Sequence, residues 1–194
     1  QGGRGAYGAV NGDPDCNGAN ELCLSCNDKL GKSASYRADA IERSAITLGL
    51  KADEWFKAAA EAYNVGDTNT GDLAGKRGLE LLTELDRLME SHPLNRLERW
   101  IDMARQHSTN PELQHFYESN ARQIVTVWGP PVNDYSCRIW SGLVRDFYRG
   151  RMELILESLK TGKPFDRNTW ELAWVRSSGV SKVKPFVDPV KEAQ

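Results

Sequence analysis

The chain has 194 residues, of which 40% are hydrophobic and 27% charged, and its formal net charge is −2 at pH 7. This length fits one domain with a substantial core, and the balanced charge argues against nucleic-acid binding as the main role. No stretch approaches the roughly 20 apolar residues of a membrane span, and no signal-peptide pattern is present. Because the chain begins with Gln1 and not with Met, we expect a processed chain or a fragment.

Residues 1–20 are rich in glycine, asparagine and aspartate, which predicts an irregular lead-in or linker. Cys16, Cys23 and Cys26 lie within or next to this segment, and Cys137 lies far along the chain. Four cysteines allow three sets of disulfide pairings, and we expect at least one disulfide to involve the N-terminal cysteines if the protein is exported. The C-x-x-C spacing of Cys23 and Cys26 is also typical of redox-active pairs and of zinc half-sites.

Hydrophobic periodicity predicts helices along most of the remaining chain. A first helix begins near Ser33 and ends at a break over residues 66–72. A second, strongly amphipathic helix contains residues 81–89 and ends before Pro93, and a short third helix follows around residues 97–104. The acidic residues of the second helix recur at helical spacing, which predicts a solvated face made of Glu80, Glu84, Asp86 and Glu90.

The segment VTVWGPPVNDY (residues 125–135) separates two further predicted helices. The fourth helix starts after Asn110, an N-cap followed by a proline, and a Gly-Pro pair stops it, which leaves Trp128 at its end. An Asn-Asp pair then caps the fifth helix, so Tyr135 falls in its first turn. The fifth helix is expected to bury a face made of Ile139, Leu143, Phe147, Ile155 and Leu159.

The end of the chain predicts a sixth helix around residues 170–174 and an extended, loosely held tail over residues 177–194. No strand-like alternation of useful length occurs anywhere in the sequence. The expected fold is therefore an all-α bundle of five to seven helices behind an irregular glycine-rich lead-in.

Trp128 and Tyr135 flank a short loop that two prolines stiffen. Two aromatic rings on such a rim suit stacking on the apolar face of a sugar ring, and the tyrosine hydroxyl can bond a sugar hydroxyl. The alternative is that both rings only pack the junction of two helices. No catalytic motif occurs, and His92, His107 and His115 lack metal-ligand spacing, so we predict no metal site and no cofactor.

The stretch QIVTVWGPPVNDYSCRIWSGLVRDFY resembles the C-terminal region of the α-N-acetylglucosaminidases, glycoside hydrolase family 89. That family carries a W-G-P turn, then D-Y, then a helix with a Gly-Leu pair. Further segments match in the same order: SYRADAIERSA, LLTELDRLMES, LERWIDMAR, FYESNARQ and PFDRNTWELAWV. The resemblance covers residues 21–176.

The resemblance implies a helical domain that packs on a catalytic (β/α)8 barrel and forms part of its sugar pocket. Such enzymes release terminal α-linked N-acetylglucosamine with retention, by two carboxylates that lie on the barrel, so it implies no catalytic residue in this chain. Trp128, Tyr135 and Val132 match positions that line the sugar site. The implied location is secreted, periplasmic or lysosomal.

Two other readings stay open at this point. One is a non-catalytic helical module that binds glycan or protein through the rim at Trp128. The other is an independent redox or zinc protein that depends on its cysteines.

Overall fold

The structure, a computed structural model, describes the backbone of residues 15–128 and 138–194, and the side chains of these residues from Gly18 onward. Its helices are α1 (Asp15–Ser25), α2 (Asn27–Leu30), α3 (Ala34–Asn64), α4 (Thr68–Glu90), α5 (Leu97–Arg105), α6 (Pro111–Ile124), the π-helix η1 (Val144–Arg149), α7 (Gly150–Thr161), α8 (Arg167–Arg176) and α9 (Pro189–Ala193). Within the described ranges there is no β-strand, and one isolated bridge joins Arg96 to Ser141. The all-α prediction is confirmed.

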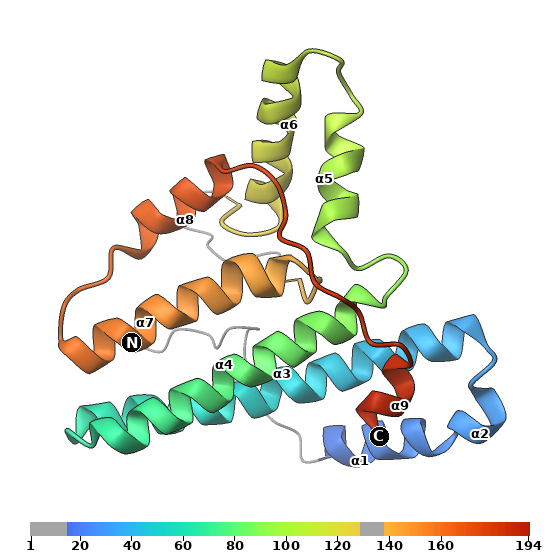
Figure 1. The fold of residues 1–194 in the computed structure, drawn as a ribbon, viewed down its shortest axis with the longest axis horizontal. Helices are drawn as coiled ribbons and strands as arrows, with labels where there is room; N and C mark the ends of the chain where they lie inside the picture. The colour runs from blue at the N-terminus through green and yellow to red at the C-terminus, as the bar shows by residue number, and fades with distance from the viewer. Residues whose placement is uncertain (1–14, 129–137) are drawn as a thin grey trace.

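The two longest helices, α3 and α4, lie side by side along the base of the molecule (Figure 1). Helix α7 lies along them, and α5 and α6 form a hairpin that projects away from this base (Figure 1). Helix α8 contacts α6, and an extended segment runs from α8 past the hairpin to α9, which packs on α3 (Figure 1). We call this segment the C-terminal strap (residues 177–188).

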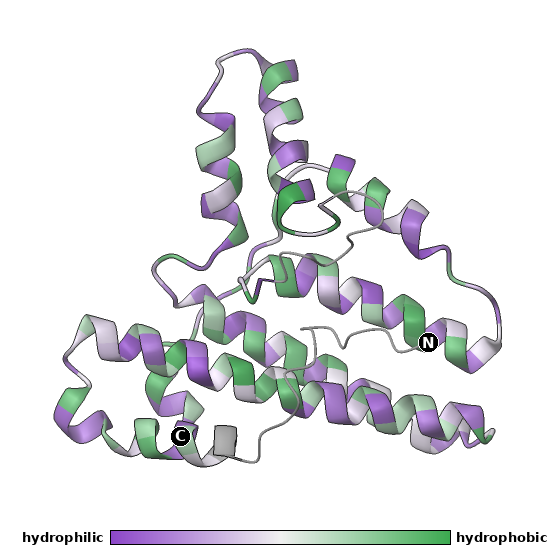
Figure 2. Ribbon diagram, turned by 180° about the vertical axis from the view of Figure 1, so that it is seen from behind, coloured by the Kyte–Doolittle hydropathy of each residue, from purple (hydrophilic) through white to green (hydrophobic). Residues whose placement is uncertain are grey.

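Close packing of α3 against α4 depends on glycines that face aromatic rings. A Cβ atom added at Gly71 would lie 2.4 Å from the Tyr63 ring, and one added at Gly78 would lie 2.4 Å from the Phe56 ring. Hydrophobic and hydrophilic residues alternate around these helices as expected for amphipathic packing (Figure 2). The core beneath them is built mainly from Leu82, Leu85, Met89, Leu97, Ile101, Leu143, Val144, Phe147 and Tyr148.

Replacement of Gly78 by alanine tests this close contact. Alanine favours a helix over glycine by up to about 1 kcal/mol, but the new methyl group must displace the buried Phe56 ring, and overpacking costs typically about 1–3 kcal/mol. We expect Gly78→Ala to lower the denaturation midpoint. Gly18→Ala is the matched control, because nothing lies within 4 Å of the added Cβ. A Gly78→Ala protein as stable as the control would contradict the packing described here.

Helix boundaries differ from the predicted ones in two places. The break after α3 is shorter than residues 66–72, because the Asp67 side chain accepts a hydrogen bond from the backbone N–H of Thr70 (3.0 Å) and starts α4 at Thr68. The predicted cap at Asn110 is confirmed, but α6 ends at Ile124. Trp128 therefore lies in a turn beyond the helix, and the Gly-Pro pair that follows it is not what ends the helix.

The fifth predicted helix begins later than expected, because residues 138–142 are not helical, and a π-helix forms its first part. Leu143 and Phe147 are fully buried as predicted, but the wide η1 turn shifts the helix phase before α7. Leu156 is consequently the buried apolar residue of α7, whereas Ile155 is half-buried and Leu159 is 39% exposed. The predicted burial of Leu159 is therefore wrong, and Ile139 of the same predicted face is, like Ile155, only half-buried.

Both ends of the described chain hold more structure than expected. Helix α1 begins at Asp15, inside the predicted irregular lead-in, and buried Asn20 accepts a hydrogen bond from the Ser44 hydroxyl (3.3 Å). The predicted tail is extended over the strap but ends in α9, whose Val190 is fully buried. The sixth predicted helix corresponds to α8.

Candidate functional site

Trp128 lies in a tight turn that follows α6. Its backbone φ is 56°, in the left-handed region that residues other than glycine seldom adopt. Gln123 holds this conformation from both sides: its carbonyl accepts from the Trp128 N–H (2.8 Å), and its side-chain amide donates to the Trp128 carbonyl (3.2 Å). The neighbouring Val125 and Val127 are buried, whereas the Trp128 side chain is 47% exposed. The turn thus fixes the backbone and presents the indole ring at the surface.

A comparison of two Trp128 variants measures the strain in this turn. A left-handed residue with a Cβ atom costs roughly 1–2 kcal/mol, and glycine avoids that cost but loses more chain entropy on folding. We expect Trp128→Gly to be about 1 kcal/mol more stable than Trp128→Ala in urea unfolding. Since the ring is half-exposed, Trp128→Ala itself should change stability far less than a core truncation. Equal stability of the two variants would argue against the left-handed turn.

A buried ionic cluster joins α6 to α5 and to the C-terminal strap. Glu118 is fully buried and accepts hydrogen bonds from Arg105 (Nε, 3.0 Å), from Arg122 (3.0 Å) and from the backbone N–H of Gly179 (2.9 Å). Arg122 is 1% exposed, also donates to the Gly179 carbonyl, and stacks over the Trp174 ring at 4.5 Å. Burial by itself would raise the pKa of Glu118, but these hydrogen bonds outweigh it and hold the pKa below its usual value.

A second ionic cluster holds residues 141–145, where the π-helix η1 begins. Asp86 of α4 is 1% exposed and accepts from the backbone N–H groups of Gly142 (2.8 Å) and Arg145 (3.1 Å), and from the Arg145 guanidinium. Glu90 accepts from the Ser141 hydroxyl. Burial raises the pKa of Asp86 to about 6, against the opposing effect of Arg145 and the two N–H groups. The prediction that Asp86 lies on a solvated face is therefore wrong.

The other predicted rim residues lie outside the described part of the chain. This applies to Val132 and Tyr135, so the structure does not test whether they share a site with Trp128. Cys137 and the side chain of Cys16 also lie outside it, whereas Cys23 and Cys26 are free thiols. The expected disulfide among the N-terminal cysteines stays a prediction.

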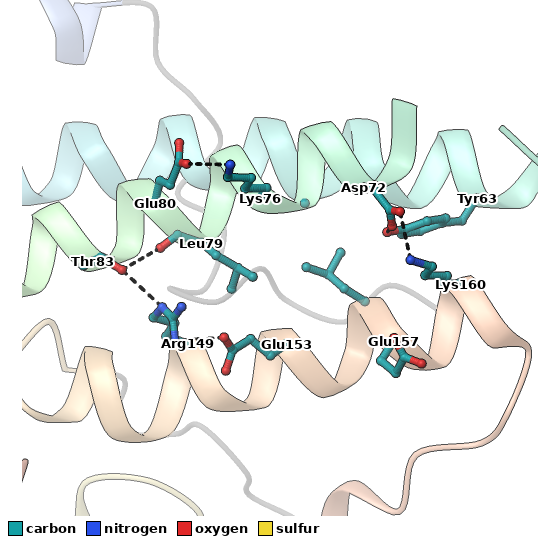
Figure 3. A pocket seen from close by; sticks show the side chains of 12 residues that line it. Tyr63, Asp72, Lys76, Leu79, Glu80, Thr83, Arg149, Glu153, Glu157 and Lys160 are labelled. Carbon is teal, nitrogen blue, oxygen red and sulfur yellow. Dashed lines mark hydrogen bonds and ion pairs between the residues drawn. The ribbon is translucent and has the colours of Figure 1, made fainter. Parts of the chain in front are cut away.

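A surface groove of about 410 Å³ lies between α4 and α7 (Figure 3). Several of its charged groups are paired with one another: Asp72 accepts from the Tyr63 hydroxyl (2.8 Å) and from Lys160 (2.8 Å). Burial and the neighbouring Asp72 raise the pKa of Tyr63 to about 12. These pairs connect the ends of three helices, α3, α4 and α7. A phenol with this pKa is a poor acid at neutral pH. The lining residues are Tyr63, Asp72, Gly75, Lys76, Leu79, Glu80, Thr83, Arg149, Glu153, Leu156, Glu157 and Lys160.

Among the described residues, no group of three or more histidine, cysteine or acidic side chains is placed to hold a metal ion. Nor is any helix in those residues both long and apolar enough to cross a membrane. His92 is buried and partnered, because its Nδ1 accepts from the N–H groups of Leu94 (3.1 Å) and Asn95 (2.9 Å) and its Nε2 lies 3.1 Å from Glu42. His92 therefore has a structural role.

Fold and site together define an all-α domain in which two buried ionic clusters stabilise the chain on either side of an aromatic surface turn. The chain belongs to the family of alpha-N-acetylglucosaminidase (NAGLU) C-terminal domains, whose family profile matches residues 12–194. This match begins before the predicted boundary at residue 21 and continues through the strap and α9.

Known relatives are much longer than this chain. Human alpha-N-acetylglucosaminidase is 29% identical over 187 residues, which cover 89% of this chain and 25% of the human protein. A family 89 glycoside hydrolase from Clostridium perfringens, solved in complex with PUGNAc, has a TM-score of 0.79 and 25% identity and is matched over 90% of this chain and 22% of its own. The same bacterial protein solved with its substrate GlcNAc-alpha-1,4-galactose gives a TM-score of 0.78 at 24% identity. The chain thus spans about a quarter of the length of these relatives.

Proposed function

We propose that this chain is the C-terminal helical domain of a retaining α-N-acetylglucosaminidase, in which it packs on a catalytic (β/α)8 barrel and lines the pocket for terminal α-linked N-acetylglucosamine. The observation that carries the proposal is the Trp128 turn, which presents a half-exposed indole on a backbone fixed by Gln123. A fixed, exposed aromatic ring suits stacking against a sugar. Tyr135 and Val132 belong to the same proposal through the family resemblance.

Exposed apolar residues on α6 support the packing of a further domain next to Trp128. Leu113, Phe116 and Ile124 are 46%, 56% and 44% exposed, and their spacing places them on one side of the helix. The buried Glu118 and Arg122 occupy the inner side of the same helix. Exposed apolar clusters of this kind are typical of surfaces that pack against a partner. Figure 2 shows hydrophobic residues along the projecting hairpin.

The chemistry in this proposal belongs to the parent enzyme. Retaining glycosidases use one carboxylate as nucleophile and a second as acid and base, and we place both on the barrel. The 194-residue chain alone should therefore not hydrolyse an aryl α-N-acetylglucosaminide. Turnover by the purified chain, abolished by replacing one of its own carboxylates, would show that the acids lie here. Secretion, or transport to the periplasm or lysosome, is part of the same proposal.

The role of Trp128 is tested in the enzyme that carries this domain. Trp128→Ala removes the stacking surface, and we expect kcat/KM to fall by an amount equivalent to about 1–3 kcal/mol. Trp128→Phe keeps an aromatic ring and should retain most of the wild-type kcat/KM. Trp55→Ala is the matched control, because Trp55 of α3 is similarly exposed at 42%. Tyr135→Phe removes the hydroxyl but keeps the ring, so it tests the contribution of the hydroxyl alone. Normal kinetics for a folded Trp128→Ala enzyme, combined with glycan binding by the chain alone, would favour a non-catalytic binding module.

A further inference from the structure

The C-x-x-C pair lies at the junction of α1 and α2. Cys23 is in the last turn of α1, and Cys26 is the residue between the two helices. Both are half-buried free thiols. The Cys26 thiol donates only a long hydrogen bond, to the Leu22 carbonyl at 3.5 Å. Neither thiol is needed for the proposed sugar site, so their placement requires a separate explanation.

The backbone at this junction brings the two side chains together. The Cys26 N–H donates to the Cys23 carbonyl at 3.1 Å, which closes a turn of the 3₁₀ type. Side chains three residues apart eclipse in such a turn, and its rise of roughly 2 Å per residue puts the two residues about 6 Å apart. Disulfide-bonded cysteines have Cα atoms usually about 4.4–6.8 Å apart. The turn therefore places the two Cα atoms within the range found for disulfides, so that rotation of the side chains can bring the thiols together without a change of fold.

Contacts around the junction hold this turn in place. The Tyr36 hydroxyl of α3 donates to the Cys23 carbonyl (3.0 Å), and the Gln194 side chain donates to the Leu24 carbonyl (2.9 Å). Both cysteines pack against a small core of Leu24, Tyr36, Ala40 and Val190. Two groups held next to each other in this way react as an intramolecular pair, at a high effective concentration.

We propose that Cys23 and Cys26 form a reversible disulfide by exchange with a low-molecular-weight disulfide. The thiolate of one cysteine attacks the donor, which releases one donor thiol and leaves a mixed disulfide on the protein. The second thiolate attacks the protein-bound sulfur, closes the Cys23–Cys26 bond and releases the second thiol. Two electrons pass from the cysteine pair to the donor, and the two protons lost by the cysteines appear on the released thiols. The bond would fix the α1–α2 junction, on which the C-terminal helix α9 docks.

The test uses the 194-residue chain and oxidised glutathione. After exchange, free thiols are alkylated and the protein is cleaved after Glu21, which separates Cys16 from the pair. We expect a single peptide beginning at Leu22 that has lost two hydrogen atoms and carries neither alkyl group nor glutathione. The same reaction in denaturant should give at least about tenfold less of this product at equilibrium, because the turn is then lost.

The Cys26→Ser variant is the control, since it should take up one glutathione at Cys23 without closing a ring. Retention of the circular dichroism spectrum shows that the variant is folded. If the variant does not fold, the peptide map of the wild-type protein still tests the proposal. Cross-linking of either cysteine to Cys16 or Cys137, or two stable glutathione adducts on the pair, would overturn the proposal.

Discussion

Glu118→Ala is expected to lower the free energy of unfolding by about 3–5 kcal/mol, because removal of one partner of a buried ion pair leaves the other partner charged and unsatisfied. Arg122, at 1% exposure, cannot turn to solvent, and the Gly179 N–H loses its acceptor at the same time. Arg105 is 37% exposed, so in the Glu118→Ala variant water should solvate its guanidinium group. Urea unfolding monitored by circular dichroism measures the loss, and Glu54→Ala, at an exposed position of α3, should change stability by less than about 0.5 kcal/mol.

The same cluster predicts an acid-dependent loss of stability. The folded pKa of Glu118 lies below its ordinary value of 4.5, so its contribution is fully present above pH 4.5 and is lost as pH falls through the lower folded pKa. Glu118→Gln removes this titration while keeping the shape of the side chain. Its stability should therefore change less than that of the wild type below pH 4.5. A wild-type curve with the same slope as Glu118→Gln in that range would contradict a buried, charged Glu118.

Removal of residues 177–194 is expected to destabilise the domain by at least about 5 kcal/mol, which is a large part of the stability of an ordinary domain. The strap supplies Gly179 to the Glu118 cluster, and its Phe186 ring lies 4.1 Å beneath the Arg87 guanidinium. Helix α9 then places the fully buried Val190. Loss of this segment exposes apolar surface and also removes the Gly179 backbone groups that bond the buried Glu118 and Arg122.

The truncation is measured by thermal unfolding and by hydrogen exchange. Amides of the α5–α6 hairpin should exchange faster in the truncated chain, because the strap no longer covers the inner side of α6. Val187→Ala is the control, since Val187 is 96% exposed within the same segment. A truncated chain with an unchanged melting temperature would mean that the strap is a passive tail.

The helices that could be predicted from sequence are those with local signals. The Asn110-Pro111 start is readable because the asparagine side chain accepts from the N–H groups of Glu112 (2.8 Å) and Leu113 (3.2 Å), an interaction within four residues. The start near Ser33 is readable for the same reason, since its side chain accepts from the Tyr36 N–H. Trp128 stands out in the sequence because it borders a short, stiff loop, and its side chain is 47% exposed, but its place in a sugar site stays a prediction.

The burial of Asp86 could not be predicted, because its partners are distant in sequence. Asp86 has the helical spacing of a solvated face. Its carboxylate oxygens nevertheless accept hydrogen bonds from donors of Gly142 and Arg145. The buried side of α7 could not be predicted either. Hydrophobic periodicity assumes a constant number of residues per helical turn, and the π-helix over residues 144–149 changes that number. A search for acidic residues that lack a nearby basic partner on their own helix would have brought Asp86 to notice.

The Glu118 cluster also sets an order for folding. Its Arg105, Glu118 and Arg122 belong to the hairpin, but the Gly179 N–H that completes it is 61 residues further along the chain. A ribosome delivers the hairpin first, so a nascent chain carries an incompletely paired carboxylate until the strap has emerged. Contacts over such long separations form slowly, because the chain entropy is lost before the contact is gained. The hairpin therefore completes its core only when nearly the whole domain has been synthesised.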